Sequence, residues 1–418
     1  IVFLRIKIHR MVNMVKTYPG PKPLPVIGNV LELGTNTKGQ KWKSHRRLIT
    51  PTFHFKILEQ FVDVFNSNIS ILISKLKDCV NKDEFNIYPY VTLYALDNIC
   101  ETAMGVSVNA QKDSESEYVK AIRSLCELIM NRSFRPWYHI DYIFNLSPLG
   151  RLQKRCLSIL HNTTRNVVES RKKEILEGKT NNENSVSVDD TGGKKKVAFL
   201  DLLLQSSIEN SGELTDEDIQ EEVDTLMFEG HDTSSSSISF SCWALGNYPE
   251  IQEKVVAELK SVFGDSDRLP TYQDLQELKY LEMFIKESLR LYPSVPFYGR
   301  ELSEDISFGE YTVPAGANVF IATFGIHRDP KYFLDPEKFD PDRFLPENSI
   351  NRHSHCYIPF AAGPRNCVGQ KFAMFEIKAT LCQLLRTFKF MKCDTPLCLT
   401  NEIVLKSLTG INVKLQYR

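Results

Sequence analysis

The sequence predicts a mainly α-helical protein with small β-sheets, an α+β fold. From Lys41 onward, polar and apolar residues recur with a period of about 3.6, which is typical of amphipathic helices. Residues 215–247 continue this pattern over a long segment in which Gly230 is the only helix breaker before Gly246. Residues 306–320 instead combine short β-favouring runs with flanking turn residues, which predicts a small sheet beside the helices.

Composition indicates an ordinary globular protein. The chain has 418 residues, 25% of them charged and 42% hydrophobic, with a formal net charge of -1. This balance argues against a nucleic-acid binder, which normally carries a marked basic excess. The 10 cysteines are scattered singly from Cys79 to Cys398, unlike the dense spacing of a secreted disulfide scaffold, so we expect a reducing, cytosolic setting.

Residues 1–40 differ from the rest of the chain. An apolar run at residues 1–4 is followed by Arg5, Lys7 and further basic residues, which is typical of the end of a membrane anchor with its cytosolic flank. Residues 19–25 are rich in proline and form a stiff segment with few backbone donors. We expect an anchor remnant, a basic flank and a proline hinge; an ordinary proline-rich tail is the alternative.

The run Phe-Ala-Ala-Gly-Pro-Arg-Asn-Cys-Val-Gly at residues 360–369 is suited to hold a metal-bound thiolate. Gly363 and Gly369 allow the backbone to turn tightly around a flat cofactor and to direct amide groups at the Cys367 sulfur. A buried helix face follows, and its N-terminal end is expected to lower the pKa of the Cys367 thiol.

Two neighbours of the cysteine extend this interpretation. Arg365 can pair with an anionic group through its planar guanidinium, and Phe360 can shield the sulfur from water. A buried structural cysteine is the simpler alternative. A zinc site is another, because His353, His355 and Cys356 are close in sequence, although the chain lacks the paired Cys-x-x-Cys spacing of zinc fingers.

The middle of residues 215–247 breaks the rules of helix composition. Gly230 costs about 1 kcal/mol relative to alanine in a helix interior, and polar residues surround it. The missing side chain lets a flat ring or dioxygen approach the backbone, while Thr233 and Asp232 can hold and deliver protons through water. A kinked, hydrated helix without a functional role is the alternative.

The pattern Phe-x-x-Gly-x-Arg-x-Cys-x-Gly resembles the haem-binding signature of the cytochrome P-450 haem-thiolate monooxygenases. The resemblance covers the chain from about Lys41 to its end, together with the proline segment. It implies one large cytochrome P-450 domain at residues 41–418, with a flexible loop at residues 181–196. It also implies that Cys367 is the proximal ligand of haem iron (iron protoporphyrin IX).

Residues 215–247 resemble the oxygen-binding helix of the same family. Thr233 matches the threonine that supports protonation of dioxygen, and Asp232 matches the neighbouring acid, so we expect both to be catalytic. The variant around Glu229 resembles the family-4 subgroup, in which the matching glutamate can form an ester with a haem methyl group. Glu229 is therefore expected to link the haem covalently.

Further residues match positions that hold the haem or brace its pocket. Glu287, Arg290 and Arg343 resemble a buried Glu-Arg-Arg network that supports the cysteine loop. Arg300 and Arg46 match contacts to a haem propionate; an unremarkable basic helix is the alternative for the segment around Arg46. The expected cofactor-binding residues are Cys367, Phe360, Gly363, Arg365, Gly369, Glu229, Gly230, Arg300, Trp42 and Arg46.

The match fails between Pro25 and Trp42. Relatives place there a helix, two strands and a loop that roofs the substrate pocket, whereas one average helix and strand pair already needs more than the residues available. We therefore expect part of the N-terminal sheet and of the pocket roof to be missing, and a chain truncated at its N-terminus. Residues 131–151 are rich in aromatics, which predicts an entrance lip or a lipid contact; plain core is the alternative.

The predicted function is insertion of one oxygen atom of O2 into a hydrophobic substrate such as a fatty acid, a lipid hormone or a xenobiotic. The resemblance implies an NADPH-cytochrome reductase, and also cytochrome b5, as electron donors that dock near Lys43, Arg47 and Lys371. It implies the cytosolic face of the endoplasmic reticulum membrane as location. A truncated isoform that is inactive or only binds haem is the alternative, and a haem-thiolate isomerase or dehydratase is a third.

Overall fold

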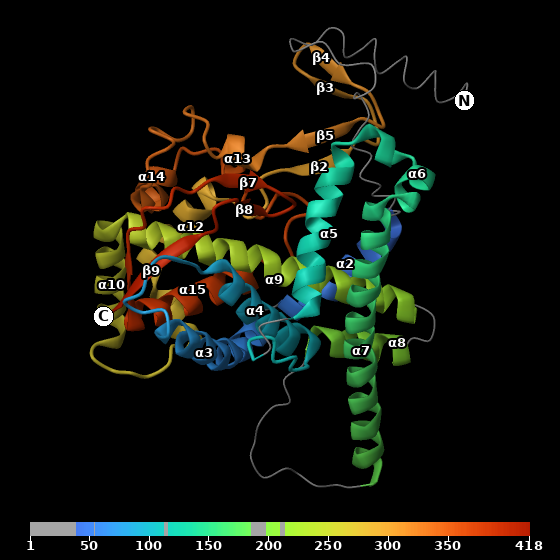
Figure 1. The fold of residues 1–418 in the computed structure, drawn as a ribbon, viewed down its shortest axis with the longest axis horizontal. Helices are drawn as coiled ribbons and strands as arrows, with labels where there is room; N and C mark the ends of the chain where they lie inside the picture. Colours follow the sequence, from blue (N-terminus) through green and yellow to red (C-terminus); the bar gives the residue numbers. More distant parts are fainter. Residues whose placement is uncertain (1–38, 54, 113–115, 185–197, 210–213) are drawn as a thin grey trace.

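The computed structural model describes residues 39–418 apart from 54, 113–115, 185–197 and 210–213 (Figure 1). These residues confirm a mainly helical fold with small antiparallel sheets. The predicted anchor remnant and proline hinge at residues 1–38 lie outside the described part. None of the described helices is long and apolar enough to cross a membrane.

The helices follow one another along most of the chain. The longer ones are α2 (Gly39–Ile49), α3 (Phe55–Lys77), α4 (Tyr88–Ile99), α5 (Glu117–Ser133), α7 (Pro148–Asn184), α8 (Phe199–Glu209), α9 (Asp216–Asn247), α10 (Pro249–Phe263), α12 (Lys279–Leu291) and α15 (Gln370–Thr387). The short ones are α6 (Asp141–Leu146), α11 (Tyr272–Glu277), α13 (Thr323–Ile326) and α14 (Pro346–Ser349), and the 3-10 turns include η1 (Thr50–Phe53), η3 (Pro136–His139), η4 (Pro341–Phe344) and η5 (Ser354–Cys356). A π-helical turn, η2 (Cys100–Met104), extends α4.

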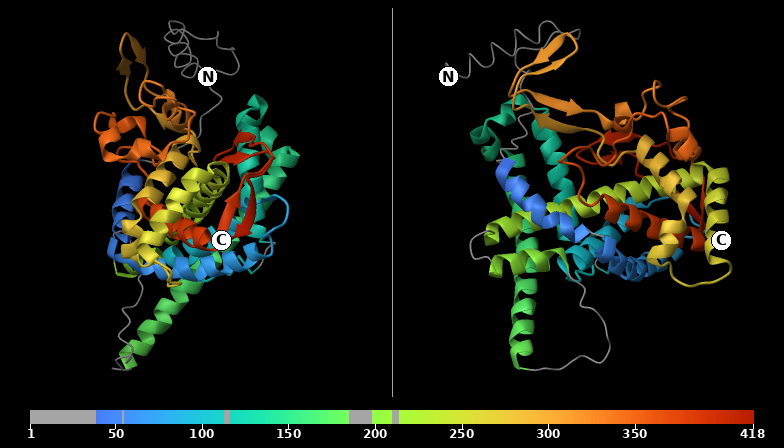
Figure 2. Two further views of the ribbon diagram at one scale, coloured as in Figure 1. Left: turned by 90° about the vertical axis from the view of Figure 1, so that its left-hand side faces the viewer. Right: turned by 180° about the vertical axis from the view of Figure 1, so that it is seen from behind.

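Helix α9 runs through the middle of the molecule, with α4 and α15 beside it (Figures 1 and 2). The predicted capping box begins it: the Thr215 hydroxyl accepts from the Asp218 amide at 3.1 Å, and the Asp218 carboxylate accepts from the Thr215 amide at 2.9 Å. Pro249 starts the next helix. At 1.5 Å per residue, the 32 residues of α9 span about 48 Å, long enough to contribute side chains to both sides of the core.

The core beneath the cysteine loop is aromatic. Phe372, two residues into α15, makes edge-to-face contacts with Phe53, Phe61 and Phe65 at centroid distances of 6.3, 6.0 and 5.3 Å. All four rings are buried. This cluster fixes the start of α15, and with it the loop that carries Cys367, against α3.

The predicted sheet near residues 306–320 is present as two antiparallel hairpins. Strand β2 (Tyr298–Glu301) pairs with β5 (Asn318–Ile321), and β3 (Ile306–Phe308) pairs with β4 (Tyr311–Val313). Sequence reasoning missed the C-terminal sheets, in which β9 (Asn412–Tyr417) lies between β1 (Phe85–Asn86) and β6 (Phe388–Met391), and β7 (Leu399–Asn401) pairs with β8 (Leu405–Ser407).

One predicted boundary is wrong. Residues 181–184, assigned to a flexible loop, belong to α7, which continues to Asn184. The remainder of that predicted loop, residues 185–196, lies outside the described residues. The helical pattern persists because these first residues are polar but contain no proline or glycine that would end the helix.

Candidate haem-thiolate site

The loop that carries Cys367 folds back on itself before α15. The Cys367 amide donates to the Phe360 carbonyl at 2.9 Å, and the Asn366 amide donates to the Gly363 carbonyl at 3.1 Å. Gly363 and Ala361 adopt positive φ angles of 78° and 57°, and glycine takes such values at no steric cost. Around Gly363 an added Cβ would meet no atom within 4 Å, so the loop borders open space.

The expected lowering of the Cys367 pKa is wrong for the protein alone. Burial raises the pKa of the thiol to about 11, and the charge of Glu229 raises it further, against the lowering effects of the Gly369 amide and of Arg46. Desolvation outweighs the helix N-terminus because part of the thiol lies among apolar neighbours, although its side chain still reaches solvent. A bound metal cation therefore has to stabilise the thiolate.

Glu229 and Thr233 lie one turn apart on the same face of α9. The Thr233 hydroxyl donates to the Glu229 carbonyl at 2.7 Å, and the Ser294 hydroxyl donates to the Thr233 carbonyl at 2.8 Å. Burial, followed by the charge of Glu222, raises the pKa of Glu229. Because the Glu229 charge also raises the pKa of Cys367, the two groups border the same space.

Asp232 lies on another face of α9. Its carboxylate accepts a hydrogen bond from the Tyr88 hydroxyl of α4 and lies 3.7 Å from the Lys406 ammonium, and its side chain is buried. The structure thus separates the two predicted catalytic residues: Thr233 shares a helix face with Glu229, whereas Asp232 faces α4 and the C-terminal hairpin. No sequence signal singles out Tyr88 or Lys406 as its partners.

Gly230 has a packing role that the sequence did not suggest. A Cβ at this position would lie 2.7 Å from two side-chain atoms of Ile99, so the glycine lets α9 approach α4 closely. The close approach that the structure shows at Gly230 is to Ile99 of α4; the expected approach of a flat ring or dioxygen stays a prediction. The helical turn places Gly230 about 100° away from Glu229.

The predicted arginines gather around the cysteine loop. Arg46 donates to the carbonyl and side-chain oxygens of Asn366 at 2.8 and 2.9 Å. Arg365 stacks on Trp42, with its guanidinium carbon 4.1 Å from the ring centroid. Arg300 donates to the Gly299 carbonyl at 2.8 Å, and its charge contributes to lowering the pKa of Arg365.

These groups fit haem. Within the described ranges, Arg46, Arg300 and Arg365 form no ion pair with a carboxylate of the protein, and uncompensated guanidiniums suit the anionic propionates. The Cys367 thiol is exposed beside the glycine loop, where a flat cofactor could reach it. No cluster of three His, Cys, Asp or Glu side chains suited to a metal occurs in the part of the chain that the structure describes, which argues against the zinc alternative.

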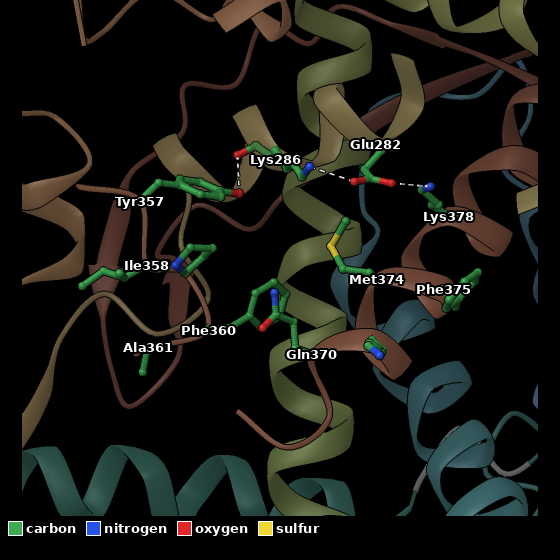
Figure 3. A pocket seen from close by; sticks show the side chains of 12 residues that line it. Glu282, Lys286, Tyr357, Ile358, Phe360, Ala361, Gln370, Met374, Phe375 and Lys378 are labelled. Carbon is green, nitrogen blue, oxygen red and sulfur yellow. Dashed lines mark hydrogen bonds and ion pairs between the residues drawn. The ribbon is translucent and has the colours of Figure 1, made fainter. Parts of the chain in front are cut away.

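A depression lies behind the loop, on the side of α12 and α15 (Figure 3). Its volume is about 310 Å³, and Phe360, Met374 and Phe375 form its apolar wall. Glu282 joins Lys286 and the buried Lys378, each at 2.8 Å, along one rim. Sequence reasoning missed Lys378, which lies inside the buried run of α15 at residues 376–385.

The sequence comparisons agree with this site. A family model described as Cytochrome P450 matches residues 34–412. Cytochrome P450 4c3 of Drosophila melanogaster is 46% identical over 402 residues, covering 94% of this chain and 74% of that protein. Cytochrome P450 4V2 of Homo sapiens is 45% identical over 395 residues, covering 93% and 74%. The predicted membership is confirmed: the chain belongs to the cytochrome P450 family and is a haem-iron monooxygenase, an oxidoreductase that uses O2, a redox partner and an organic substrate.

Proposed function

We propose that this chain hydroxylates a hydrophobic substrate, of the fatty acid, lipid hormone or xenobiotic class, with electrons that NADPH-cytochrome reductase supplies. Bound haem supplies the chemistry of dioxygen binding and reduction. The observation that supports the proposal is that the charge of Glu229, which shares a helix face with Thr233, acts on the Cys367 thiol. Turnover of a fatty-acid panel with purified reductase tests it, and hydroxylated product is the expected result.

We propose that the cysteine loop and its arginines bind haem, whereas residues of α9 handle protons. Cys367 provides the ligand, and the loop hydrogen bond from its amide to Phe360 fixes the sulfur. Arg300 and Arg365 hold the propionates, while Arg46, tied to Asn366, keeps the loop in place. On α9, the Thr233 hydroxyl would hold a proton for the oxygen chemistry that haem supplies, and Asp232 is a buried carboxyl group of the same helix beside Lys406.

Replacing Thr233 by valine is expected to lower substrate turnover by about 100-fold, the lower end of the usual contribution of a positioned proton donor. Valine keeps the shape of the side chain and removes the hydroxyl. Haem binding and the absorption spectrum should not change, whereas hydrogen peroxide should replace product as the fate of the electrons. Thr225→Val, on an exposed turn of the same helix, is the control and should behave as wild type. Equal product yields from Thr233→Val and wild type would contradict this role.

We further propose that Glu229 forms an ester with a haem methyl group. Its raised pKa reflects burial and the charge of Glu222, so a covalent bond relieves the cost of a carboxylate in this position. The new bond joins a carboxylate oxygen to the methyl carbon, which loses a hydrogen. The enzyme's own oxygen chemistry supplies this two-electron oxidation.

Acid extraction tests the ester. Wild-type holoprotein should retain part of its haem on the polypeptide after turnover, whereas Glu229→Ala should release all of it unmodified. Glu222→Ala is the matched control, because Glu222 lies on the same helix but pairs with His45 at 2.7 Å, and it should retain haem as wild type does. Complete release of unmodified haem from the wild-type protein would overturn the proposal.

A membrane-facing surface supports a location on the cytosolic face of the endoplasmic reticulum membrane. Of the aromatics in residues 131–151, Phe134, Trp137 and Tyr142 are 73%, 57% and 75% exposed, whereas Phe144 is buried. They lie at the corner where α5, η3 and α6 lead into α7 (Figure 1). Exposed aromatics beside basic residues such as Arg135 are suited to a lipid interface rather than to plain core.

The double change Trp137→Ala and Tyr142→Ala is expected to weaken binding to vesicles of anionic and zwitterionic phospholipid by about tenfold. The two exposed rings provide apolar surface that lipid would bury. They contribute little buried area to the folded core, so their removal should not destabilise the fold. Leu334→Ala, which removes an equally exposed apolar side chain elsewhere (79% exposed), should leave vesicle binding unchanged. Sedimentation with vesicles measures the difference, and equal losses in both variants would rule out a specific surface.

The reductase, and cytochrome b5 as a second donor, are proposed to dock on the side of the depression behind the cysteine loop. Lys371 lines that depression and Lys286 lies on its rim, while Lys43 and Arg47 are exposed on α2. An acidic partner surface complements this charge. Phe360 lines the depression, and its carbonyl accepts a hydrogen bond from the Cys367 amide at 2.9 Å. A partner docked there would therefore deliver its electron close to the proposed iron ligand.

A truncated isoform that binds haem without turnover is the second candidate. The observation that favours it is the short interval between the proline segment at residues 19–25 and Trp42. The proposed pocket roof would then be incomplete, and water would reach the iron. A thiolate-type spectrum without product from any substrate, in the presence of active reductase, is the result that would support it.

A further inference from the structure

Glu376 is a carboxyl group that lies at the junction of three helices. It belongs to α15 and has no exposed surface. Its Oε1 accepts a hydrogen bond from the Asn98 side-chain amide of α4 at 2.8 Å, and the Asn98 oxygen accepts from Asn68 of α3 at 3.0 Å. Its Oε2 has no hydrogen-bond partner among the described residues. The Ser234 hydroxyl of α9 nevertheless lies near enough to influence the carboxyl.

The surroundings of Glu376 are polar but contain no balancing cation. From α4, Asn98 and Tyr94 face it, and the Tyr94 hydroxyl is shared with Thr380 of α15 at 2.9 Å. Ser234 faces it from α9, and Asn68 reaches it through Asn98 from α3. In the described part of the chain, no lysine, arginine or histidine contributes to its ionisation. A buried carboxylate without a cation is costly, so the neutral acid is the favoured form.

We propose that Glu376 is a positioning residue that fastens α15 to α4, the helix packed against α9, and so fixes the cysteine loop relative to α9. Helix α15 begins three residues after Cys367, and Ser234 directly follows Thr233 in α9. Through Asn98 the carboxyl group joins α15 to α4, and α4 in turn packs against α9 where Ile99 meets Gly230. The expected effect of Glu376 on oxygen chemistry rests on the proposed monooxygenase function. Its role in holding α15 in place does not depend on that function.

The protonation state provides the test. Burial raises the pKa of Glu376 from its usual value near 4.5 to about 7, against smaller lowering effects of Asn98 and Ser234. Between these two pH values the folded protein binds more protons here than the unfolded chain. Stability is therefore lost as the pH rises from about 4.5 to about 7, and the loss is complete above that window. Glutamine keeps the size and one acceptor but does not titrate.

The experiment compares the haem-loaded full chain with three variants, Glu376→Gln, Glu376→Ala and Gln383→Ala. Gln383 is the matched control, because it is a buried polar residue of the same helix that donates to Asn66 of α3 at 2.7 Å and does not reach α9. Melting temperatures are measured between about pH 5 and pH 8. With reductase and NADPH, the share of electrons released as hydrogen peroxide is measured at each pH.

We expect the melting temperature of Glu376→Gln relative to wild type to rise between pH 5 and pH 8, because only the wild type loses stability over that range. Glu376→Ala should at least double the peroxide share, while Gln383→Ala should lower the melting temperature equally at all pH values and leave the peroxide share unchanged. A pH-independent difference between Glu376→Gln and wild type would overturn the proposal, as would an unchanged peroxide share in Glu376→Ala. Failure of the monooxygenase proposal would remove turnover from every variant but leave the melting profiles intact.

Discussion

Replacing Cys367 by serine is expected to lower monooxygenase turnover by at least about 1000-fold, a loss of about 4 kcal/mol of transition-state stabilisation. Serine has nearly the same size and keeps the backbone bond from residue 367 to Phe360. It cannot supply the thiolate whose electron donation favours cleavage of the dioxygen bond. NADPH-dependent product formation with purified reductase measures the loss, and haem content measured in parallel shows whether the cofactor stays bound.

Cys398→Ser is the control for this prediction. Cys398 is exposed, as is part of Cys367, but it lies in the C-terminal hairpin region away from the glycine loop. The control should keep wild-type turnover and spectrum. Turnover by Cys367→Ser at the wild-type rate would show that another residue holds the iron, and the assignment of the site would be wrong.

Replacing Glu287 by alanine is expected to destabilise the fold by about 3 to 5 kcal/mol, because it strands buried charge. Arg290 donates to Glu287 at 2.7 and 2.8 Å, both side chains have no exposed surface, and Arg343 approaches the same carboxylate at 3.4 Å. Arg290 also donates to the His327 and Pro336 carbonyls, so the pair ties α12 to the chain that leads to the cysteine loop. The predicted Glu-Arg-Arg network is thereby confirmed.

Equilibrium unfolding in denaturant measures this second effect. The exposed pair of Lys173 and Glu177 in α7, 3.8 Å apart, is the control, and Glu177→Ala should cost no more than about 0.5 kcal/mol. Glu287→Ala should also give a low yield of haem-loaded protein, since the loop it supports is displaced. A loss of stability equal to that of Glu177→Ala would mean that the buried pair contributes no more than a surface contact.

The sequence predicted the parts of the fold that local rules control. The capping box at Thr215, the long helix α9 and the hairpins after α12 follow from spacing and turn residues close together in the chain. The C-terminal sheet was missed because β1 is short and pairs with β9, more than 300 residues further on, as in the pair Phe85 and Val413. Pairing over such a separation leaves no local pattern to recognise.

The sequence predicted which residues gather around the cysteine loop, but not which way the side chains of α9 face. The cysteine loop, Arg46, Arg365 and Trp42 come together as expected. Helical periodicity alone could not show that Asp232 and Gly230 contact α4 while Thr233 shares a face with Glu229, because polar residues occupy both faces of α9 there. The raised pKa of Cys367 was missed for a related reason: desolvation depends on neighbours distant in sequence.

The absorbance difference between the reduced protein with and without carbon monoxide tests the central claim most directly. If the Cys367 sulfur is the axial ligand, the haem-loaded wild-type chain should give the strongly red-shifted band of a thiolate-ligated haem, and Cys367→Ser should not give it. A wild-type band at the position typical of nitrogen-ligated haem, unchanged in Cys367→Ser, would contradict the assignment of this sulfur to the iron.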